Sequence, residues 1–199
     1  ELSPYHETTT VAGGGDGNAF VETWHGQNQS MQEDVIRNKF LYSQDLLNAY
    51  WDKSLVTAVS DIDAPTGFDE SFLITSLGGG TCRVRSSEQR MIEGETYTIS
   101  AFLKKGNQSS VHIAASFQSP TPVVTFNLNN GTVYFVTGGA TGVMEDFGGG
   151  WYRCSMTLTA TNTNSTTIFN FTLGVYGSTN AGLTALYNGL QFDDGATAT

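Results

Sequence analysis

Three long runs of residues alternate between apolar and polar side chains, and this period of two limits the fold more than any other feature. The runs cover residues 96–104, 151–160 and 167–175. Successive side chains of a β-strand point to opposite faces of the sheet, so each run predicts an antiparallel strand with one buried face. In the last run, for example, Phe169 and Phe171 share one face, and threonine and asparagine occupy the other.

Shorter apolar runs extend this pattern along the chain and bring the expected number of strands to about ten. They lie at residues 55–59, 72–75, 111–117, 123–128, 132–136 and 185–192. Glycine- and asparagine-rich turns separate them, and Asn130-Gly131 between two runs predicts a β-hairpin. The one helical turn expected here lies at residues 44–49. Many short strands without intervening helices predict an all-β fold, an antiparallel jelly-roll β-sandwich over residues 39–199.

The charge distribution separates residues 1–38 from this sandwich. The chain has a formal net charge of −10, and residues 1–38 contain six acidic side chains and one arginine. Their glycine-rich stretch 13–18 predicts a flexible linker. Residues 30–33 fit a capping box that precedes the apolar residues 35–36, which predicts a short helix of one or two turns at the end of this segment. We expect an extended N-terminal arm, either disordered or becoming ordered when it docks on a partner.

The scarcity of cations excludes several classes of partner. Nine Lys and Arg residues against 19 Asp and Glu cannot form the basic stripe that nucleic-acid binding requires. The same deficit argues against anionic membrane surfaces, and no stretch approaches the ~20 apolar residues of a membrane span. We therefore expect neither nucleic-acid binding nor membrane insertion.

Two cysteines, Cys82 and Cys154, both fall in strand-like runs. Because cysteine is among the most buried residue types, two buried free thiols are favoured, with a single disulfide as the alternative.

Residue patterns typical of enzymes are missing from the sequence, so we expect a non-enzymatic protein without a cofactor. His112 is the one histidine within the predicted sandwich, and it is expected to be a surface or packed strand residue facing away from Val111 and Ile113. Paired carboxylates do occur. Asp61 and Asp63 would share one side of an extended segment, which makes them weak candidates for Ca²⁺ binding; solvated turn residues are the alternative.

Aromatic side chains are the main resource for ligand binding. An acidic, cation-poor and aromatic-rich surface suits a neutral glycan, although most aromatic residues in strands belong to the core. Tyr134 and Tyr187 are the candidates for exposed glycan contacts, since their apolar neighbours would face inward. Trp24 in the arm is a third candidate.

Several segments together resemble a carbohydrate-binding-module-like jelly-roll domain that is common in bacteriophage tail and other virion proteins. The resemblance covers about residues 38–199, in the order expected for that family. Its segments are 38–44 (NKFLYSQ), 48–53 (NAYWDK), 94–100 (GETYTIS), 103–106 (LKKG), 145–146 (ED) with 150–154 (GWYRC), and 189–197 (GLQFDDGAT).

This resemblance implies a protein on the surface of a phage particle, often a trimer, with glycan adhesion as its role and no catalytic residue. It also implies that Trp51 and Trp151 are structural packing anchors and that Arg153 pairs with Glu145 or Asp146. We therefore expect a glycan-adhesion domain of a tail fibre or tail-associated protein, with other virion proteins and host-surface glycan as partners. The alternatives are a capsid decoration subunit that docks through residues 1–38, and an accessory domain of a glycan-active enzyme.

Overall fold

The computed structural model describes residues 5–7, 23–25, 38–174, 180–196 and 198. The chain divides into two units, residues 1–35 and 36–199. In the first unit, strand β1 (Tyr5–Glu7) pairs antiparallel with β2 (Thr23–His25), which places Trp24 opposite His6. The predicted linker at 13–18 and the predicted helix near 30–36 lie outside the described residues.

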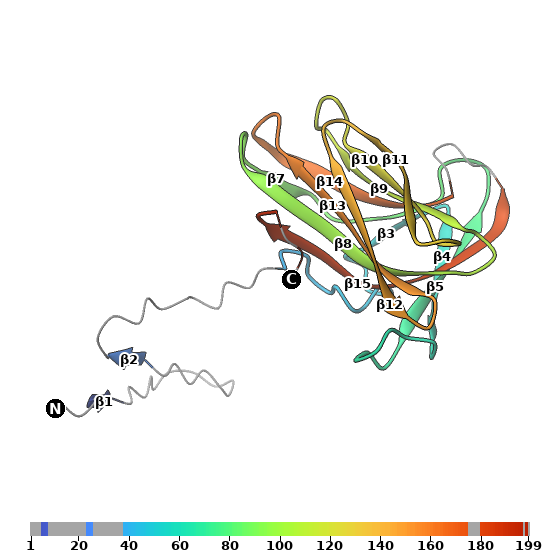
Figure 1. Cartoon of the computed structure of the whole chain (residues 1–199), viewed down its shortest axis with the longest axis horizontal. Coiled ribbons are helices and arrows are strands. Elements are labelled where there is room, and N and C mark those ends of the chain that lie inside the picture. The colour runs from blue at the N-terminus through green and yellow to red at the C-terminus, as the bar shows by residue number, and fades with distance from the viewer. Residues whose placement is uncertain (1–4, 8–22, 26–37, 175–179, 197, 199) are drawn as a thin grey trace. The chain divides into compact units, whose positions relative to one another are not determined.

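The described residues of the second unit form two antiparallel sheets with thirteen strands between them (Figure 1). The seven-stranded sheet has the order β11 (Thr132–Thr137), β10 (Val123–Asn127), β9 (Ser110–Ser116), β14 (Asn164–Leu173), β6 (Arg83–Arg85) and β3 (Asp52–Ser54), and β7 (Gln89–Met91) also pairs with β14. The six-stranded sheet has the order β12 (Thr141–Gly148), β13 (Trp151–Thr159), β8 (Thr96–Lys105), β15 (Ala181–Asp194), β5 (Ser71–Leu77) and β4 (Val56–Asp61). The predicted all-β sandwich is confirmed.

The core lies between the two sheets and is rich in aromatic rings. Phe169 of β14 meets Phe192 of β15 with their ring centroids 4.7 Å apart, which joins the two sheets directly. Phe40 and Trp51 extend this cluster, with centroids 5.2 Å apart in an edge-to-face arrangement. The indole of Trp51 is buried, and its Nε1 donates to the carbonyl of Tyr42 at 2.9 Å.

The segment before β3 folds as successive turns, so the helical turn predicted at residues 44–49 is wrong. The backbone N–H of Asp45 bonds to Tyr42 O, that of Asn48 to Asp45 O, and that of Trp51 to Asn48 O. The carboxylate of Asp45 accepts two backbone N–H groups as well, a local bond that competes with helix formation. Among the described residues, no helix is long and apolar enough to span a membrane.

Both cysteines are buried and free. Cys82 precedes β6 and Cys154 lies on β13 in the other sheet. The favoured prediction of two buried thiols is confirmed, and the alternative of a disulfide is wrong.

Candidate functional site

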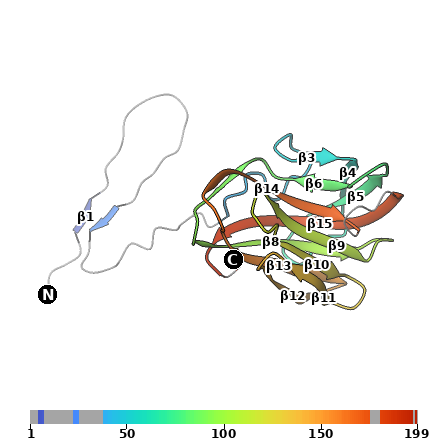
Figure 2. The same ribbon diagram turned by 90° about the horizontal axis from the view of Figure 1, so that it is seen from above.

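A groove on the outer face of the seven-stranded sheet is the candidate functional site. It encloses about 670 Å³ and is built by β6, β9, β10, β11 and β14, which lie side by side in Figure 2. Its lining consists of Arg83, His112, Ala114, Ser116, Phe117, Thr121, Val123, Thr125, Tyr134, Phe135, Thr137, Asn170 and Thr172.

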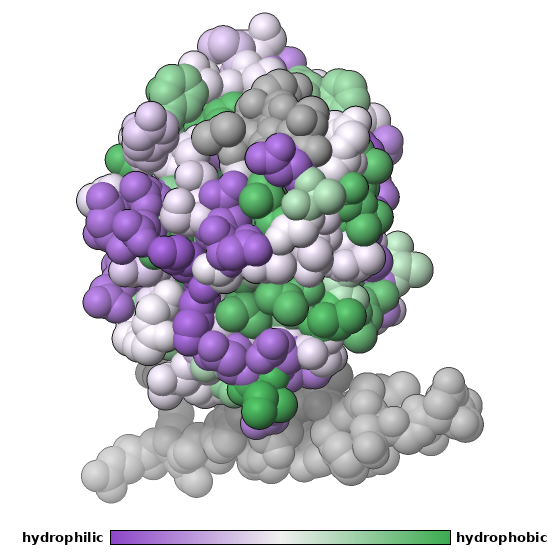
Figure 3. All heavy atoms as spheres, turned by 90° about the vertical axis from the view of Figure 1, so that its right-hand side faces the viewer, coloured by the Kyte–Doolittle hydropathy of each residue, from purple (hydrophilic) through white to green (hydrophobic). Residues whose placement is uncertain are grey.

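Exposed hydrophobic surface alone would not have located this site, because it also occurs elsewhere on the sandwich. Ile62 is 95% exposed and does not line the groove. Figure 3 shows one side of the sandwich, where hydrophobic and hydrophilic surfaces adjoin. The groove differs in being hollow and in combining aromatic rings with polar groups, as small-molecule and cofactor sites commonly do.

The alternation on β9 explains why the sheet is hollow at this point. Val111, Ile113 and Ala115 face the core, so His112, Ala114 and Ser116 line the opposite face. Alanine and serine have short side chains, and a strand that carries them on its outer face leaves space above the sheet.

Cross-strand pairing orders the polar side chains of the groove into a row. Thr172 of β14 is the register partner of Arg83 on one side and of His112 on the other. His112 is in turn paired with Thr125 of β10, and Thr125 with Phe135 of β11. Neighbouring strands are ~4.8 Å apart, so the row extends across the strands for roughly 19 Å. An elongated ligand that crosses the strands would contact all five strands.

His112 forms part of the groove floor in its neutral state. The residue is 1% exposed, and its Nδ1 lies 3.2 Å from the carbonyl oxygen of Gly174. Since a carbonyl only accepts, Nδ1 carries the proton and donates it to Gly174. Burial, and to a smaller extent the positive charge of Arg83, lowers the pKa of His112 to about 4. The sequence predicted that His112 is either a surface residue or a packed one, and the structure shows that it is packed.

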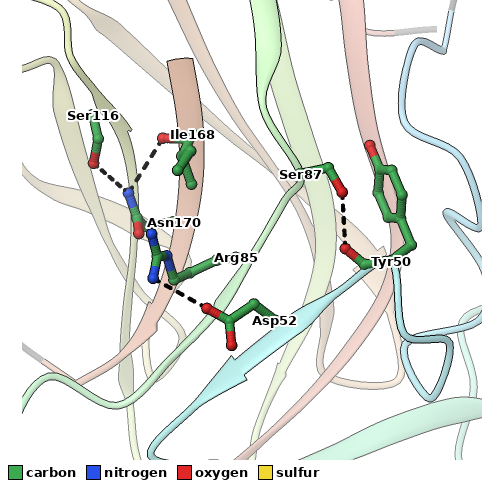
Figure 4. Close-up of polar contacts among 7 residues, drawn as sticks. All are labelled: Tyr50, Asp52, Arg85, Ser87, Ser116, Ile168 and Asn170. Carbon is green, nitrogen blue, oxygen red and sulfur yellow. Dashed lines mark hydrogen bonds and ion pairs between the residues drawn. The ribbon is translucent and has the colours of Figure 1, made fainter. Parts of the chain in front are cut away.

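Hydrogen bonds hold the polar side chains beside this row in place (Figure 4). The Nδ2 of Asn170 donates to Ser116 Oγ at 2.7 Å and to the carbonyl of Ile168 at 3.3 Å. Its register partner Arg85 forms an ion pair with Asp52, with Nη1 and Oδ2 3.1 Å apart. The bonds of Asn170 fix a polar side chain of the groove floor, and the Arg85–Asp52 pair lies beside the groove.

Two adjacent aromatic residues of β11 form one wall of the groove. Tyr134 is 72% exposed and Phe135 is 53% exposed, and both belong to the lining. The pairing of β10 with β11 shifts between Thr125 and Phe126, so that Phe135 and Val133 have partners and Tyr134 is skipped. Such a β-bulge re-aims side chains and lets two consecutive residues contribute to one site. The sequence pointed to Tyr134 but missed Phe135 and Phe117.

The prediction that Tyr187 is exposed is wrong. Its side chain is fully buried in the core. Tyr187 lies on β15, which has neighbouring strands on both sides, β8 and β5, and its neighbour Leu186 is buried too. The third aromatic candidate, Trp24, lies on β2 in the other unit.

Arg153, expected to pair with Glu145 or Asp146, forms no hydrogen bond with either carboxylate. Burial lowers the pKa of Arg153 to about 10, and the charges of Asp193 and, more weakly, Glu145 oppose this shift. Glu145 is the register partner of Arg153 on β12, but the guanidinium is buried and donates its hydrogen bonds to other groups. It donates to the carbonyl of Gly189 at 3.0 Å, to Ser100 Oγ at 2.7 Å and to Gln191 Oε1. Arg153 also lies over the ring of Phe102, 4.4 Å from its centroid. Its role is therefore structural, within the six-stranded sheet.

The carboxylates of Asp61 and Asp63 accept hydrogen bonds from neighbouring groups of the chain. Asp61 Oδ1 accepts the backbone N–H of Asp63 at 2.8 Å. The carboxylate of Asp63 pairs with Lys104 Nζ at 2.7 Å and accepts the indole N–H of the buried Trp151 at 3.2 Å. The hydrogen bond from Lys104 is the main cause that lowers the pKa of Asp63. In the part of the chain that the structure describes, no group of three or more His, Cys, Asp or Glu side chains is placed to hold a metal ion.

Comparison with known proteins identifies similar folds only. No protein-family model and no curated protein matches the chain. An arabinose-bound GH51 α-L-arabinofuranosidase matches with a TM-score of 0.50 and 13% identity, over 80% of this chain and 25% of the enzyme. The enzymatically active domain of tailspike protein 4 of bacteriophage CBA120 matches with a TM-score of 0.50 and 12% identity, over 79% of this chain and 21% of that chain. The chain thus spans about a quarter or less of each protein.

A xylan-binding domain, CBM22-1 from Paenibacillus barcinonensis Xyn10C, is also similar, with a TM-score of 0.48 and 13% identity. That match covers 81% of this chain and 98% of the domain. At identities this low the first two likenesses establish a shared β-sandwich architecture and no more.

Proposed function

We propose that this protein is a non-catalytic carbohydrate-binding domain that holds a glycan chain in the groove of the seven-stranded sheet. The observation that carries the proposal is the combination of exposed Tyr134 and Phe135 with a buried polar floor. The negative face of an aromatic ring attracts the C–H groups of a sugar ring. Hydroxyl and amide groups on the floor, from Thr125 and Asn170 among others, are suited to bonding sugar hydroxyls.

The composition of the lining supports binding over hydrolysis. Most glycosidases use two carboxyl groups on either side of the scissile bond. The described lining residues include no Asp or Glu. The similar carbohydrate-binding domain CBM22-1 is named for xylan binding.

The proposal is tested by isothermal titration calorimetry of the full chain against a panel of soluble polysaccharides. Tyr134→Ala should weaken binding about tenfold, because it removes the most exposed ring of the groove. Phe147→Ala is the matched control, since Phe147 is a 41% exposed aromatic residue on β12 of the other sheet. Loss of affinity in Phe147→Ala equal to that in Tyr134→Ala, or no binding of any polysaccharide, would contradict the proposal.

We propose further that this domain lies on the surface of a phage particle and contacts glycan on the host surface. The resemblance of residues 38–199 to virion domains and the tailspike likeness support it. A trimer would add avidity to a weak single site. Size-exclusion chromatography with light scattering tests the trimer, and immunogold electron microscopy of phage particles tests a tail location.

The second candidate is a capsid decoration protein that docks through residues 1–38. It is favoured by the acidic composition of this segment and by the division of the chain into two units at Val35. Immunogold label on the capsid shell, with no label on tails, would support this candidate and contradict the tail assignment.

A further inference from the structure

The charge of the groove is opposite in sign to the charge of the chain. Arg83 is the one charged side chain among the described lining residues, which include no Asp or Glu. His112 adds no charge at neutral pH, because burial keeps it in the neutral form. A chain with a net charge of −10 therefore has a local positive charge where its ligand would bind.

The residues next to Arg83 supply a second donor. Thr172 is the register partner of Arg83 on β14, is 2% exposed and belongs to the groove lining. Its Oγ1 is buried and makes no hydrogen bond to any described residue. Buried hydroxyl groups usually have a partner, so an unsatisfied one in a binding groove indicates a position for a ligand acceptor.

Arg85 shows by contrast why Arg83 is the relevant cation. It lies two residues further along β6 on the same face of the sheet. Unlike Arg83, it is not part of the groove lining. Of the two arginines, only Arg83 combines a position in the groove with a neighbouring buried hydroxyl.

We propose that the groove selects a glycan that bears a carboxylate, such as a uronic acid residue, and binds this group between Arg83 and Thr172. A guanidinium donates in a planar fork that matches the two oxygens of a carboxylate, and charge-assisted hydrogen bonds are roughly twice as strong as neutral ones. The hydroxyl of Thr172 donates to the same group. The rest of the sugar chain crosses the strands toward Tyr134 and Phe135.

This inference rests on the proposed glycan-binding function and is tested on the full chain. The ligands are oligosaccharides of three acidic polysaccharides, polygalacturonate, alginate and glucuronoxylan, each compared with its carboxyl-reduced, neutral form. At least one acidic form should bind about tenfold more tightly than its reduced form, and this preference should decrease with added salt.

Three variants locate the carboxylate site. Arg83→Gln should remove the preference for the acidic form, because it lowers the affinity for the acidic form more than the affinity for the reduced form. The matched control Arg85→Gln, on the same strand and face, should keep the preference. Thr172→Val should reduce the preference without lowering the melting temperature, since its hydroxyl has no partner among the described residues.

Each result is decisive. If acidic and reduced forms bind equally, or if Arg83→Gln and Arg85→Gln behave alike, this inference is wrong and the proposed function stands. If a sulfated, uronate-free oligosaccharide binds more tightly than every uronate, the site recognises another anion and the assignment to carboxylate is overturned. If no polysaccharide of any kind binds, the proposed function itself fails.

Discussion

We expect mild acid to destabilise the sandwich through His112, the buried histidine of the groove floor. The folded protein holds the pKa of His112 at about 4, against an ordinary value of 6.5. Between these two values the unfolded chain binds a proton that the folded chain does not bind. Stability therefore falls as the pH decreases from 6.5 toward 4, and the contribution of His112 is unchanged above 6.5.

The size of the effect follows from the difference between the two pKa values. One pKa unit corresponds to about 1.4 kcal/mol, so the difference contributes roughly 3 kcal/mol over the whole range. Burial is the main cause of the lowered pKa of His112, and the charge of Arg83 acts in the same direction. The hydrogen bond to Gly174 opposes both, since it favours the protonated form; its effect on the pKa of His112 is smaller than that of burial and larger than that of Arg83.

The assay is urea unfolding, followed by tryptophan fluorescence, at pH 7 and pH 4.5. His112→Asn is the comparison variant, because the amide nitrogen of asparagine can take the place of Nδ1 as a donor to Gly174. Carboxylates titrate in both proteins, so the pH-dependent part of the difference between them reports on residue 112. Between pH 7 and pH 4.5, the unfolding free energy of the wild type should decrease by most of the roughly 3 kcal/mol more than that of the variant. A difference that is the same at both pH values, or an imidazole pKa near 6.5 by NMR, would refute the reasoning.

Three further predictions concern the packing of the sandwich. Gly106→Ala should lower the melting temperature, because a Cβ atom there would lie 2.5 Å from the backbone carbonyl oxygen of Thr184, and an unchanged melting curve would contradict this contact. Trp51→Ala should cost about 3–5 kcal/mol in urea unfolding, and a loss below about 1 kcal/mol would show that the indole does not anchor the core. Cys82 and Cys154 should not react with Ellman's reagent in the native protein and should both react in guanidinium chloride, since both are buried. Fast reaction of the native protein would contradict their burial.

The long strands could be predicted because alternation is a local property of the sequence. The run predicted at residues 96–104 is β8 (Thr96–Lys105), and the run at 151–160 is β13 (Trp151–Thr159). Strands β3, β6 and β7 have three residues each, which is too short to show a period of two. They exist because β6 and β7 pair with β14, and β3 with β6, contacts between segments far apart in the sequence.

The groove could be predicted only in part, for the same reason. Tyr134 and Tyr187 have similar apolar neighbours, and the local pattern cannot tell an edge strand from a central one. Tyr134 lies on β11 at the end of its sheet, whereas Tyr187 lies on β15 between β8 and β5. Phe135 is the register partner of Thr125, and the β-bulge at Tyr134 lets both aromatic residues line the groove; no residue type in the sequence marks that bulge.

The net charge of −10 predicted a neutral ligand, and the groove shows why a total charge is a weak guide to the charge at a site. At physiological ionic strength the field of a charge is screened within about 8 Å, so a ligand responds to the charges beside it. The pairing of β6 with β14 places Arg83 in the groove next to Thr172, and the pairing of β6 with β3 gives Arg85 the carboxylate of Asp52. Two arginines of one strand, two residues apart, thus have different surroundings because of strand pairing. The proposed class of ligand rests on that pairing, which the composition of the chain could not have revealed.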